Sequence, residues 1–148
     1  MPRPAELSRG KSAPAGDAID VIVGIVTDAA GRVLIARRPA GRHMAGAWEF
    51  PGGKLEQGEA PLAGLKRELG EELGIGVTDA EPFVEQRFAY PDRAIRLDVW
   101  WVLAYSGSAR ALDGQTLSWV DAAALAGAPM LPADAPVVAA VCARLAGR

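Results

Sequence analysis

Apolar and polar positions along the chain follow two different periods, and these periods predict strands in some segments and helices in others. Residues 18–28 (AIDVIVGIVTD) are apolar and β-branched, which predicts a buried strand. Residues 29–31 predict a turn, and residues 32–38 (RVLIARR) predict the returning strand of a hairpin. Residues 39–47 show no period and predict a loop, after which residues 48–50 form a short strand that enters a glycine turn.

Residues 60–73 have the clearest helical period in the chain. A stripe of leucines recurs on one face at the 3.6-residue spacing of a helix: Leu62, Leu65, Leu69 and Leu73. Pro61 suits the first turn of a helix, and Gly74 suits its end. This segment is therefore predicted to be an amphipathic helix that buries its leucine stripe.

The second half of the chain returns to strands and ends in helices. Alternating segments predict three strands, with a turn at residues 90–93: residues 82–90, 94–107 and 117–121. Residues 121–127 predict a short helix, and residues 134–147 a final amphipathic one. This order predicts an α/β or α+β fold in which helices pack on a mixed sheet. We expect one domain over residues 18–148, after a flexible tail of residues 1–17 rich in Pro, Gly, Ala and Ser.

Length, charge and cysteine content restrict the classes of protein. A chain of 148 residues suits one domain with a hydrophobic core. The formal net charge is −2 and no basic stripe is present, so duplex nucleic acid is not an expected partner. Cys142 is the only cysteine, which excludes an intramolecular disulfide and suits a reducing compartment. The absence of a membrane-spanning apolar run and of a signal-peptide core leads us to expect a cytoplasmic protein.

A second face of the predicted helix carries the candidate chemistry. Glu68, Glu71 and Glu72 are three and four residues apart, so these carboxylates adjoin with no basic partner expected between them. A solvated acidic face would explain the pattern, but the glycine turn at residues 52–53 lies just upstream and can cradle a phosphate. Gly64, on the same face, is expected to leave room for a bulky ligand. Carboxylates, a carbonyl and phosphate oxygens are ligands of Mg²⁺, so a metal–phosphate site is predicted.

The spacing of these residues resembles that of a known family. Gly53 is followed by five residues, Glu59, seven residues and then RELGEELGI over residues 67–75, which resembles a complete Nudix box. The segments VGIVTDAAGRVLIARR, HMAGAWEFPGGK, YPDR and LPADAPV are similar to the MutT-like branch of that family. The resemblance runs from about residue 20 to the C-terminus. It implies a Nudix fold, in which a mixed β-sheet lies between helices and carries a loop–helix–loop motif.

The resemblance also implies an activity. MutT-like Nudix proteins hydrolyse nucleoside triphosphates to the monophosphate and pyrophosphate with Mg²⁺, for which Mn²⁺ can substitute. Oxidised nucleotides such as 8-oxo-dGTP are the expected substrates, and nucleotide-pool sanitation and mutation avoidance the expected role. A pyrophosphohydrolase of pyrimidine nucleotides such as CTP and dCTP is the alternative. A non-catalytic nucleotide-binding regulator is disfavoured, since it has no need for three mutually repelling acids. The expected partner is a small nucleotide, bound by a monomer or homodimer.

Roles are carried over from the family residue by residue. The implied metal ligands are carboxylates and a backbone carbonyl: Glu68, Glu71, Glu72, Asp113 and Gly52. The implied catalytic residues are Glu68, the candidate general base, Arg67, which would orient Glu68 by hydrogen bonding, and Glu71. Gly53 and Glu59 are expected to support the geometry of the loop and helix. The implied substrate contacts include phosphate-binding cations and a base pocket: Arg38, Lys54, His43, Glu49, Phe50 and Asp134.

Asp134 stands where the MutT branch carries an Asn that reads guanine. An Asn amide both donates and accepts hydrogen bonds, whereas an ionised Asp only accepts. Asp134 can accept from an exocyclic amine of cytosine or adenine, or bind oxidised guanine when burial keeps it protonated. It also begins the last predicted helix, where Asp is a good N-cap. The sequence leaves these three roles open.

Overall fold

A computed structural model describes residues 18–147, and the tail expected over residues 1–17 lies outside them. The elements follow in this order: β1 (Ala18–Ile25), β2 (Val33–Arg37), β3 (Trp48–Glu49), β4 (Gly52–Lys54), α2 (Pro61–Leu73), β5 (Gly76–Tyr90), β6 (Arg93–Ser106), β7 (Thr116–Val120), α3 (Ala122–Ala126) and α4 (Ala135–Ala146). These helices and strands confirm the predicted order of elements, with differences at their ends and in their pairing. One strand was not predicted: residues 52–54, expected as part of a glycine turn, form β4 because they pair with β1.

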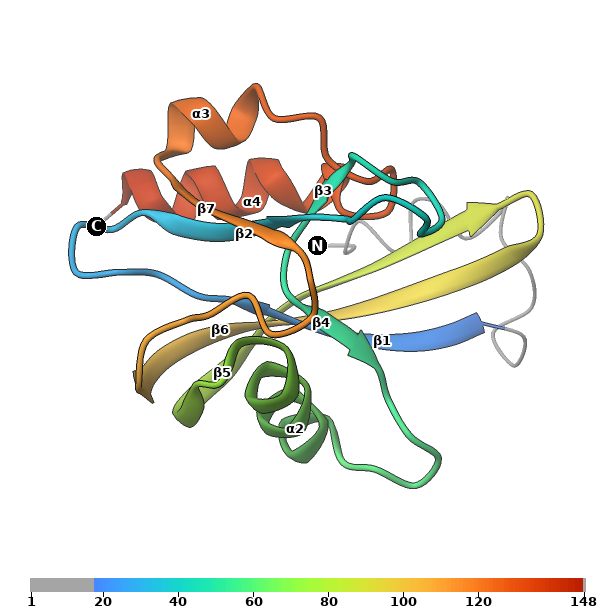
Figure 1. Ribbon diagram of the computed structural model, residues 1–148, viewed down its shortest axis with the longest axis horizontal. Helices are drawn as coiled ribbons and strands as arrows, with labels where there is room; N and C mark the ends of the chain where they lie inside the picture. Colours follow the sequence, from blue (N-terminus) through green and yellow to red (C-terminus); the bar gives the residue numbers. More distant parts are fainter. Residues whose placement is uncertain (1–17, 148) are drawn as a thin grey trace.

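The described strands form two sheets, one of four strands in the order β4-β1-β6-β5 and one of three in the order β3-β2-β7 (Figure 1). β1 runs parallel to β6, with Val21 opposite Leu97, while its other neighbour, β4, is antiparallel. The larger sheet is therefore mixed, as the sequence predicted.

The predicted hairpin of the first two strands is wrong in its pairing. Across the turn, backbone hydrogen bonds join residues 26–28 to residues 32–34 and, within the described part of the chain, no further. β2 then pairs with β7, where Ile35 lies opposite Ser118. Both edges of β1 are already occupied by β4 and β6. Because a strand has only two hydrogen-bonding edges, β2 leaves β1 and becomes the centre of the second sheet.

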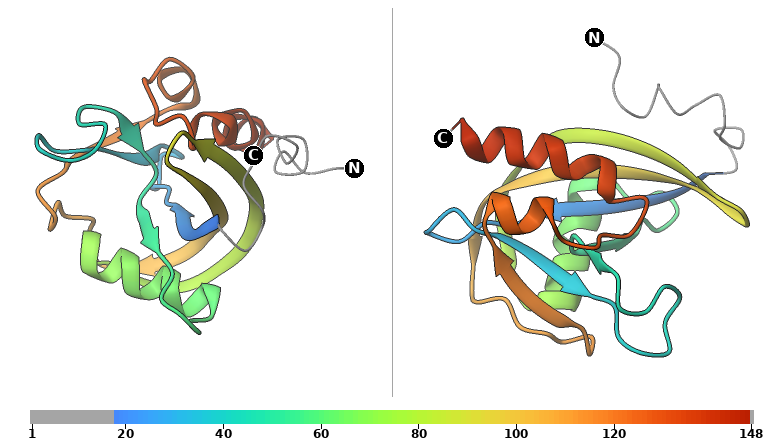
Figure 2. Two further views of the ribbon diagram at one scale, coloured as in Figure 1. Left: turned by 90° about the vertical axis from the view of Figure 1, so that its right-hand side faces the viewer. Right: turned by 90° about the horizontal axis from the view of Figure 1, so that it is seen from above.

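β1 is apolar almost throughout because both of its faces are buried. Ile22, together with Val26 just after the strand, packs on one side with α2, while Val23 and Ile25 pack on the other side with α3 and α4. Figures 1 and 2 show α2 below the larger sheet and the pair α3 and α4 on the opposite side of the molecule. The strands thus lie between helices, which confirms the expected mixed α+β architecture.

Helix α2 packs against the larger sheet through Leu65, Leu69 and Leu73, which are fully buried. Leu62, in the first turn, is 36% exposed, so the predicted stripe is one turn too long. Gly74 ends the helix with φ 72°, a left-handed conformation that glycine adopts without a steric cost, and its N–H donates to the Gly70 carbonyl.

β5 begins at Gly76, six residues before the predicted strand start. Its pairing with β6 shifts register at three points between Val77 and Val84. Each shift interrupts the alternation of inward and outward side chains, which is the signal that predicts a strand. The tight turn expected within YPDR joins Tyr90 to Arg93 at the far end of this hairpin.

Candidate active site

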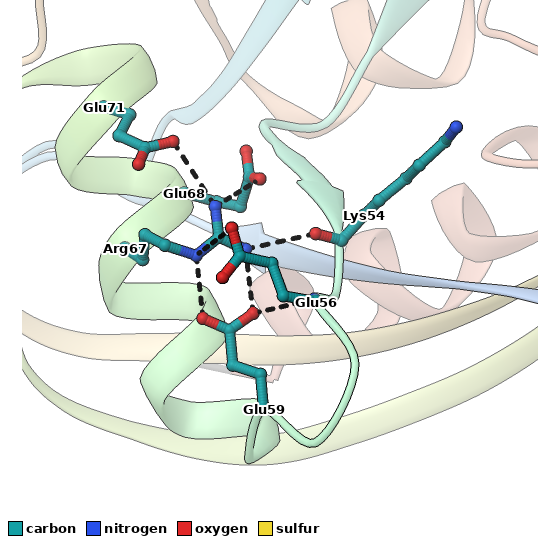
Figure 3. Close-up of polar contacts among 6 residues, drawn as sticks. All are labelled: Lys54, Glu56, Glu59, Arg67, Glu68 and Glu71. Carbon is teal, nitrogen blue, oxygen red and sulfur yellow. Dashed lines mark hydrogen bonds and ion pairs between the residues drawn. The ribbon is translucent and has the colours of Figure 1, made fainter.

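Arg67 lies at the centre of a polar cluster that joins α2 to the loop before it (Figure 3). Its guanidinium donates to both carboxylate oxygens of Glu59, at 2.7 and 2.8 Å, and to the Lys54 carbonyl at 3.1 Å. It also donates to Glu68 at 2.9 Å and to Glu71 at 3.3 Å. The expectation that the acids of α2 have no basic partner is therefore wrong for Glu68 and Glu71, and the hydrogen bond from Arg67 that the resemblance implied for Glu68 is present.

The Arg67–Glu59 pair fastens the loop to the helix. Its hydrogen bonds lower the pKa of Glu59 to about 2, helped by the backbone N–H of Glu56. The same contacts raise the pKa of Arg67. Both groups are thus ionised at neutral pH and form the bidentate pair that a guanidinium and a carboxylate favour.

Two glycines allow close contacts around this cluster. A Cβ on Gly53 would collide with the carboxylate of Glu68, so this carboxylate can occupy its position only because residue 53 has no side chain. A Cβ on Gly64 would collide with Leu55 and approach Glu59. The space beside Gly64, expected to admit a ligand, is therefore filled by the protein itself.

A cavity of about 370 Å³ lies beside α2, between the two sheets and the loop of residues 39–47. Most of the residues expected to form the site line it: Arg38, His43, Glu49, Phe50, Gly52, Gly53, Lys54, Glu68, Glu72, Asp113 and Asp134. Three of the expected residues do not line it: Glu59, Arg67 and Glu71. The Glu71 side chain is 66% exposed and is held by Arg67. The structure thus brings segments from across the chain to one cavity and leaves Glu71 outside it.

The carboxylate of Glu72 is the most perturbed acid on the α2 side of the cavity. Burial raises its pKa to about 8, and the negative charges of Glu49 and Glu68 add to this shift, while the Gly52 N–H opposes it. Within residues 18–147, no three His, Cys, Asp or Glu side chains are gathered closely enough to hold a metal ion. Glu68 and Glu72 nevertheless offer carboxylate oxygens in an electronegative site, and this donor set fits a hard divalent cation.

Glu49 and Arg38 form an ion pair on the opposite wall. Arg38 donates from Nη1 to the two oxygens of Glu49 at 3.1 and 3.2 Å, and from Nε to the His43 carbonyl at 2.6 Å. Burial raises the pKa of Glu49 even though Arg38 opposes the shift. Arg38 therefore ties the loop of residues 39–47 to β3, in addition to its expected contact with phosphate.

Asp134 is buried, with 4% of its surface exposed. Its backbone is helical (φ −86°, ψ −27°), and its side chain makes no capping hydrogen bond to α4. Instead, Oδ2 accepts a hydrogen bond of 2.9 Å from the Phe50 N–H, 84 residues away in the sequence. The N-cap role is therefore wrong, because the carboxylate turns away from the helix and towards the cavity. Burial raises the pKa of Asp134 to about 7.

The loop of residues 107–115 closes another side of the cavity. The carboxylate of Asp113 is 57% exposed and lies 3.6 Å from Arg42 in the facing loop. Gln115 accepts from the Asp113 N–H and donates to the Glu72 carbonyl, so it links this loop to the end of α2. Asp113 therefore lies at the rim of the cavity that Glu68 and Glu72, two of the other implied metal ligands, also line.

Sequence reasoning missed several residues that line the cavity, four of them polar: Arg42, Tyr90, Arg93 and Gln115. Tyr90 and Gln115 each lie beside a feature that the sequence did single out, the YPDR turn and Asp113. The YPDR turn and Asp113 could therefore have drawn attention to Tyr90 and Gln115. A tyrosine in a turn and an amide near a candidate acid do not by themselves indicate a cavity.

Within residues 18–147, no helix combines the length and the apolar character needed to cross a bilayer.

Comparison with known proteins identifies relatives over most of the chain. A family model described as NUDIX domain matches residues 22–140. The 8-oxo-dGTP diphosphatase of Escherichia coli (strain K12) is 37% identical over 82% of this chain and 94% of its own length. The CTP pyrophosphohydrolase of the same strain is 38% identical over 88% of this chain and 96% of its own length.

Solved structures match at the level of the fold as well. The solution structure of the E. coli ORF135 protein covers 92% of this chain and 98% of its own, with a TM-score of 0.79 and 37% identity. A structure of MutT, from a study of the Aliivibrio salmonicida and Vibrio cholerae proteins, covers 86% of this chain and 98% of its own. It gives a TM-score of 0.74 and 36% identity.

Proposed function

The chain belongs to the Nudix family of hydrolases, and on that basis we propose that it is an Mg²⁺-dependent nucleoside triphosphate pyrophosphohydrolase of the MutT type. One observation carries the proposal: a single cavity is lined both by the carboxylates of α2 and by the buried Asp134. The carboxylates of α2 suit a metal-bound triphosphate group, and Asp134 suits a nucleotide base. A nucleoside triphosphate has both parts, and its hydrolysis would release the nucleoside monophosphate and pyrophosphate.

Phosphoryl transfer depends on positioning and on charge neutralisation more than on covalent chemistry. Glu68 and Glu72, with Glu71, the Gly52 carbonyl and Asp113, would hold Mg²⁺ or Mn²⁺. When bound, the cation supplies charge neutralisation for the phosphates and activates water. Arg67 donates to Oε2 of Glu68, which leaves Oε1 to accept a proton from the attacking water. Arg38 and Lys54 line the cavity and would contact the phosphates, with Glu59 and Gly53 supporting the loop.

The proposed substrates are oxidised nucleotides such as 8-oxo-dGTP, with nucleotide-pool sanitation and mutation avoidance as the role. The 8-oxo-dGTP diphosphatase of E. coli, similar over most of both chains, supports this choice. His43, Glu49 and Phe50 would line the base pocket together with Asp134.

A second candidate is a pyrophosphohydrolase of CTP or dCTP. Asp134 favours it, because an ionised carboxylate accepts from the exocyclic amine of cytosine but cannot donate to a guanine carbonyl. The similarity to the CTP pyrophosphohydrolase of E. coli gives this candidate comparable support.

We further propose that residues 18–148 act as one domain, in the cytoplasm, as a monomer or homodimer. The match of the family model to residues 22–140 supports a single unit. The single cysteine supports a reducing compartment.

A turnover panel tests the function. The purified protein is incubated with Mg²⁺ and each of 8-oxo-dGTP, dGTP, dATP, CTP and dCTP, and both pyrophosphate and orthophosphate are measured. Pyrophosphate with an equal amount of monophosphate is the expected product, and 8-oxo-dGTP the expected best substrate. A clear preference for CTP or dCTP would select the second candidate. Orthophosphate as the product, or no turnover of any triphosphate, would contradict both.

A further inference from the structure

Tyr90 places a hydroxyl group in the cavity from the end of β5. Its oxygen accepts a hydrogen bond of 3.2 Å from the backbone N–H of Ala133, the residue before Asp134. The ring of Tyr90 meets Phe88 edge to face at a centroid distance of 4.8 Å, and His43 in the same manner at 6.4 Å. These neighbours fix the direction of the ring, so its hydroxyl has a defined position beside Asp134.

The hydroxyl of Tyr90 still has a proton to donate. A phenol has one O–H donor and also accepts at oxygen, and the Ala133 N–H uses the accepting side. No residue within 18–147 accepts the Tyr90 proton. A half-buried hydroxyl that lines a cavity and lacks an acceptor in the described protein is available to a ligand.

Asp134 presents the complementary group next to it. The Phe50 N–H occupies Oδ2, which leaves Oδ1 able to accept a second hydrogen bond. The cavity thus places one acceptor, from Asp134, beside one donor, from Tyr90. A base recognised by both must carry a donor and an acceptor side by side on one edge.

We propose that the Tyr90 hydroxyl is a specificity-determining donor that binds O6 of 8-oxoguanine while Asp134 accepts from N7–H of the same base. The inference rests on the proposed function and deepens it. An Asn amide could make both contacts alone, whereas an ionised Asp can make only one. Tyr90 supplies the donor that Asp134 lacks.

The same pair of groups rejects two related bases. Unoxidised guanine carries acceptors at both N7 and O6, so its N7 would face the acceptor of Asp134. 8-Oxoadenine keeps N7–H but has an amine in place of O6, so a donor would face the Tyr90 proton. Of these three purines, only 8-oxoguanine matches both groups when the edge formed by position 7 and the substituent at position 6 faces them.

Substitution of Tyr90 by Phe removes the hydroxyl and retains the ring. The chain has one other tyrosine, Tyr105, whose hydroxyl donates to the Thr27 carbonyl and does not line the cavity, so Tyr105→Phe is the matched control. Binding of 8-oxo-dGMP and 8-oxo-dAMP is measured by calorimetry in EDTA at about pH 8.5, above the pKa of Asp134. Tyr90→Phe should weaken the binding of 8-oxo-dGMP about five- to tenfold. It should not weaken the binding of 8-oxo-dAMP, because the donor that faces the amine of 8-oxoadenine is removed. Tyr105→Phe should change neither.

The 8-oxo-dAMP arm separates recognition from a structural effect. If Tyr90 acts only by holding Ala133 and hence Asp134, both nucleotides lose the contact to N7–H and weaken equally, and the proposal is overturned. Unchanged binding of 8-oxo-dGMP to Tyr90→Phe also overturns it. Turnover of 8-oxo-dGTP by the unsubstituted protein is measured in parallel. A protein that hydrolyses 8-oxo-dGTP but shows no Tyr90 effect refutes this inference alone, whereas a protein that hydrolyses no triphosphate refutes the proposed function.

Discussion

Two walls of the same cavity are built in opposite ways. The acidic wall is lined by Glu68 and Glu72, with Glu59, Arg67 and Glu71 behind them and outside the cavity, and it comes from one loop and the helix that follows it. The base wall, which comprises Phe50, Tyr90 and Asp134, comes from three distant segments. Its two defining hydrogen bonds join residues that are 84 and 43 positions apart. One wall is thus a local motif, and the other exists only in the folded chain.

The two walls also treat charge differently. In the acidic wall, Arg67 keeps Glu59 ionised, with a pKa near 2, whereas burial and neighbouring acids raise the pKa of Glu72 to about 8. In the base wall, a single N–H compensates Asp134 in part, and burial raises its pKa to about 7. The first arrangement suits a site that concentrates charge for a cation. The second suits a site that reads the pattern of donors and acceptors on a base, where an unpaired group is costly.

Removal of divalent metal is expected to have the largest effect on turnover. It should abolish the function of the acidic wall and leave binding by the base wall intact. Turnover of 8-oxo-dGTP should vanish in EDTA and return with Mg²⁺ or Mn²⁺. Ca²⁺ should support little turnover, because its looser coordination positions water poorly. Calorimetric binding of 8-oxo-dGMP through the base wall should persist in EDTA. Full turnover by the metal-free protein would contradict the assignment of the acidic wall.

Glu68→Gln should lower kcat at least ~100-fold, because it removes the candidate general base while nearly preserving volume. The Tm should change little, since the amide oxygen can still accept from Arg67. Glu56→Gln is the matched control, because the Glu56 carboxylate is 69% exposed and does not line the cavity. Steady-state kinetics and thermal unfolding of both variants test this. Near-normal kcat in Glu68→Gln would remove Glu68 from the mechanism.

Asp134→Asn should change how stability depends on pH. The Asp134 carboxyl ionises near 3.8 in the unfolded chain and near 7 in the folded protein. Between these values the folded state alone holds the proton, so the free energy of unfolding falls as pH rises through this window. The Asn variant lacks this loss, so its stability relative to the unsubstituted protein should rise steadily from pH 4 to pH 8. Urea unfolding in EDTA at pH 4, 6 and 8 measures it.

Glu59→Gln, from the acidic wall, should show the opposite sign. The pKa of Glu59 is lowered from 4.5 to about 2, so its ion pair stabilises the fold above the unfolded pKa and loses this effect as pH falls towards 2. The variant should therefore be less stable than the unsubstituted protein at pH 7, with a smaller difference at pH 3. Parallel shifts for Glu59→Gln and Asp134→Asn would show that the two walls do not differ in charge compensation.

The smallest expected effect separates two glycines of α2. A Cβ on Gly64 would press on Leu55 and Glu59, whereas a Cβ on Gly70 meets no atom nearer than 3.8 Å. Gly64→Ala should lower the free energy of unfolding by about 1 kcal/mol, since crowding outweighs the gain in helix propensity. Gly70→Ala should raise it by about 0.5–1 kcal/mol. Equal stabilisation of both variants would show that the contact beside Gly64 adapts freely.

The sequence predicted much of the fold because its signals are local. The stripe Leu65, Leu69 and Leu73 predicted α2, and Gly74 predicted its end. Alternation located the strands but not their partners. It placed the start of β5 too late, since register shifts between Val77 and Val84 break the pattern. The pairing of β2 with β7 depends on which edges of β1 are free, and that is a property of the whole sheet.

The same division holds for the site. Helix spacing was sufficient to group Glu68 with Glu71 and Glu72, because residues three and four apart share a face. The roles of Glu59 and Arg67 were implied by the resemblance to the Nudix box. The sequence did not predict that the side chain of Leu55 occupies the space beside Gly64. It also did not predict that the carboxylate of Asp134 points away from α4 and accepts from the Phe50 N–H. Those contacts, and the position of Tyr90 beside Ala133, were decided by the tertiary structure. Burial and hydrogen-bond partners between distant segments exist only once the sheets and helices have packed.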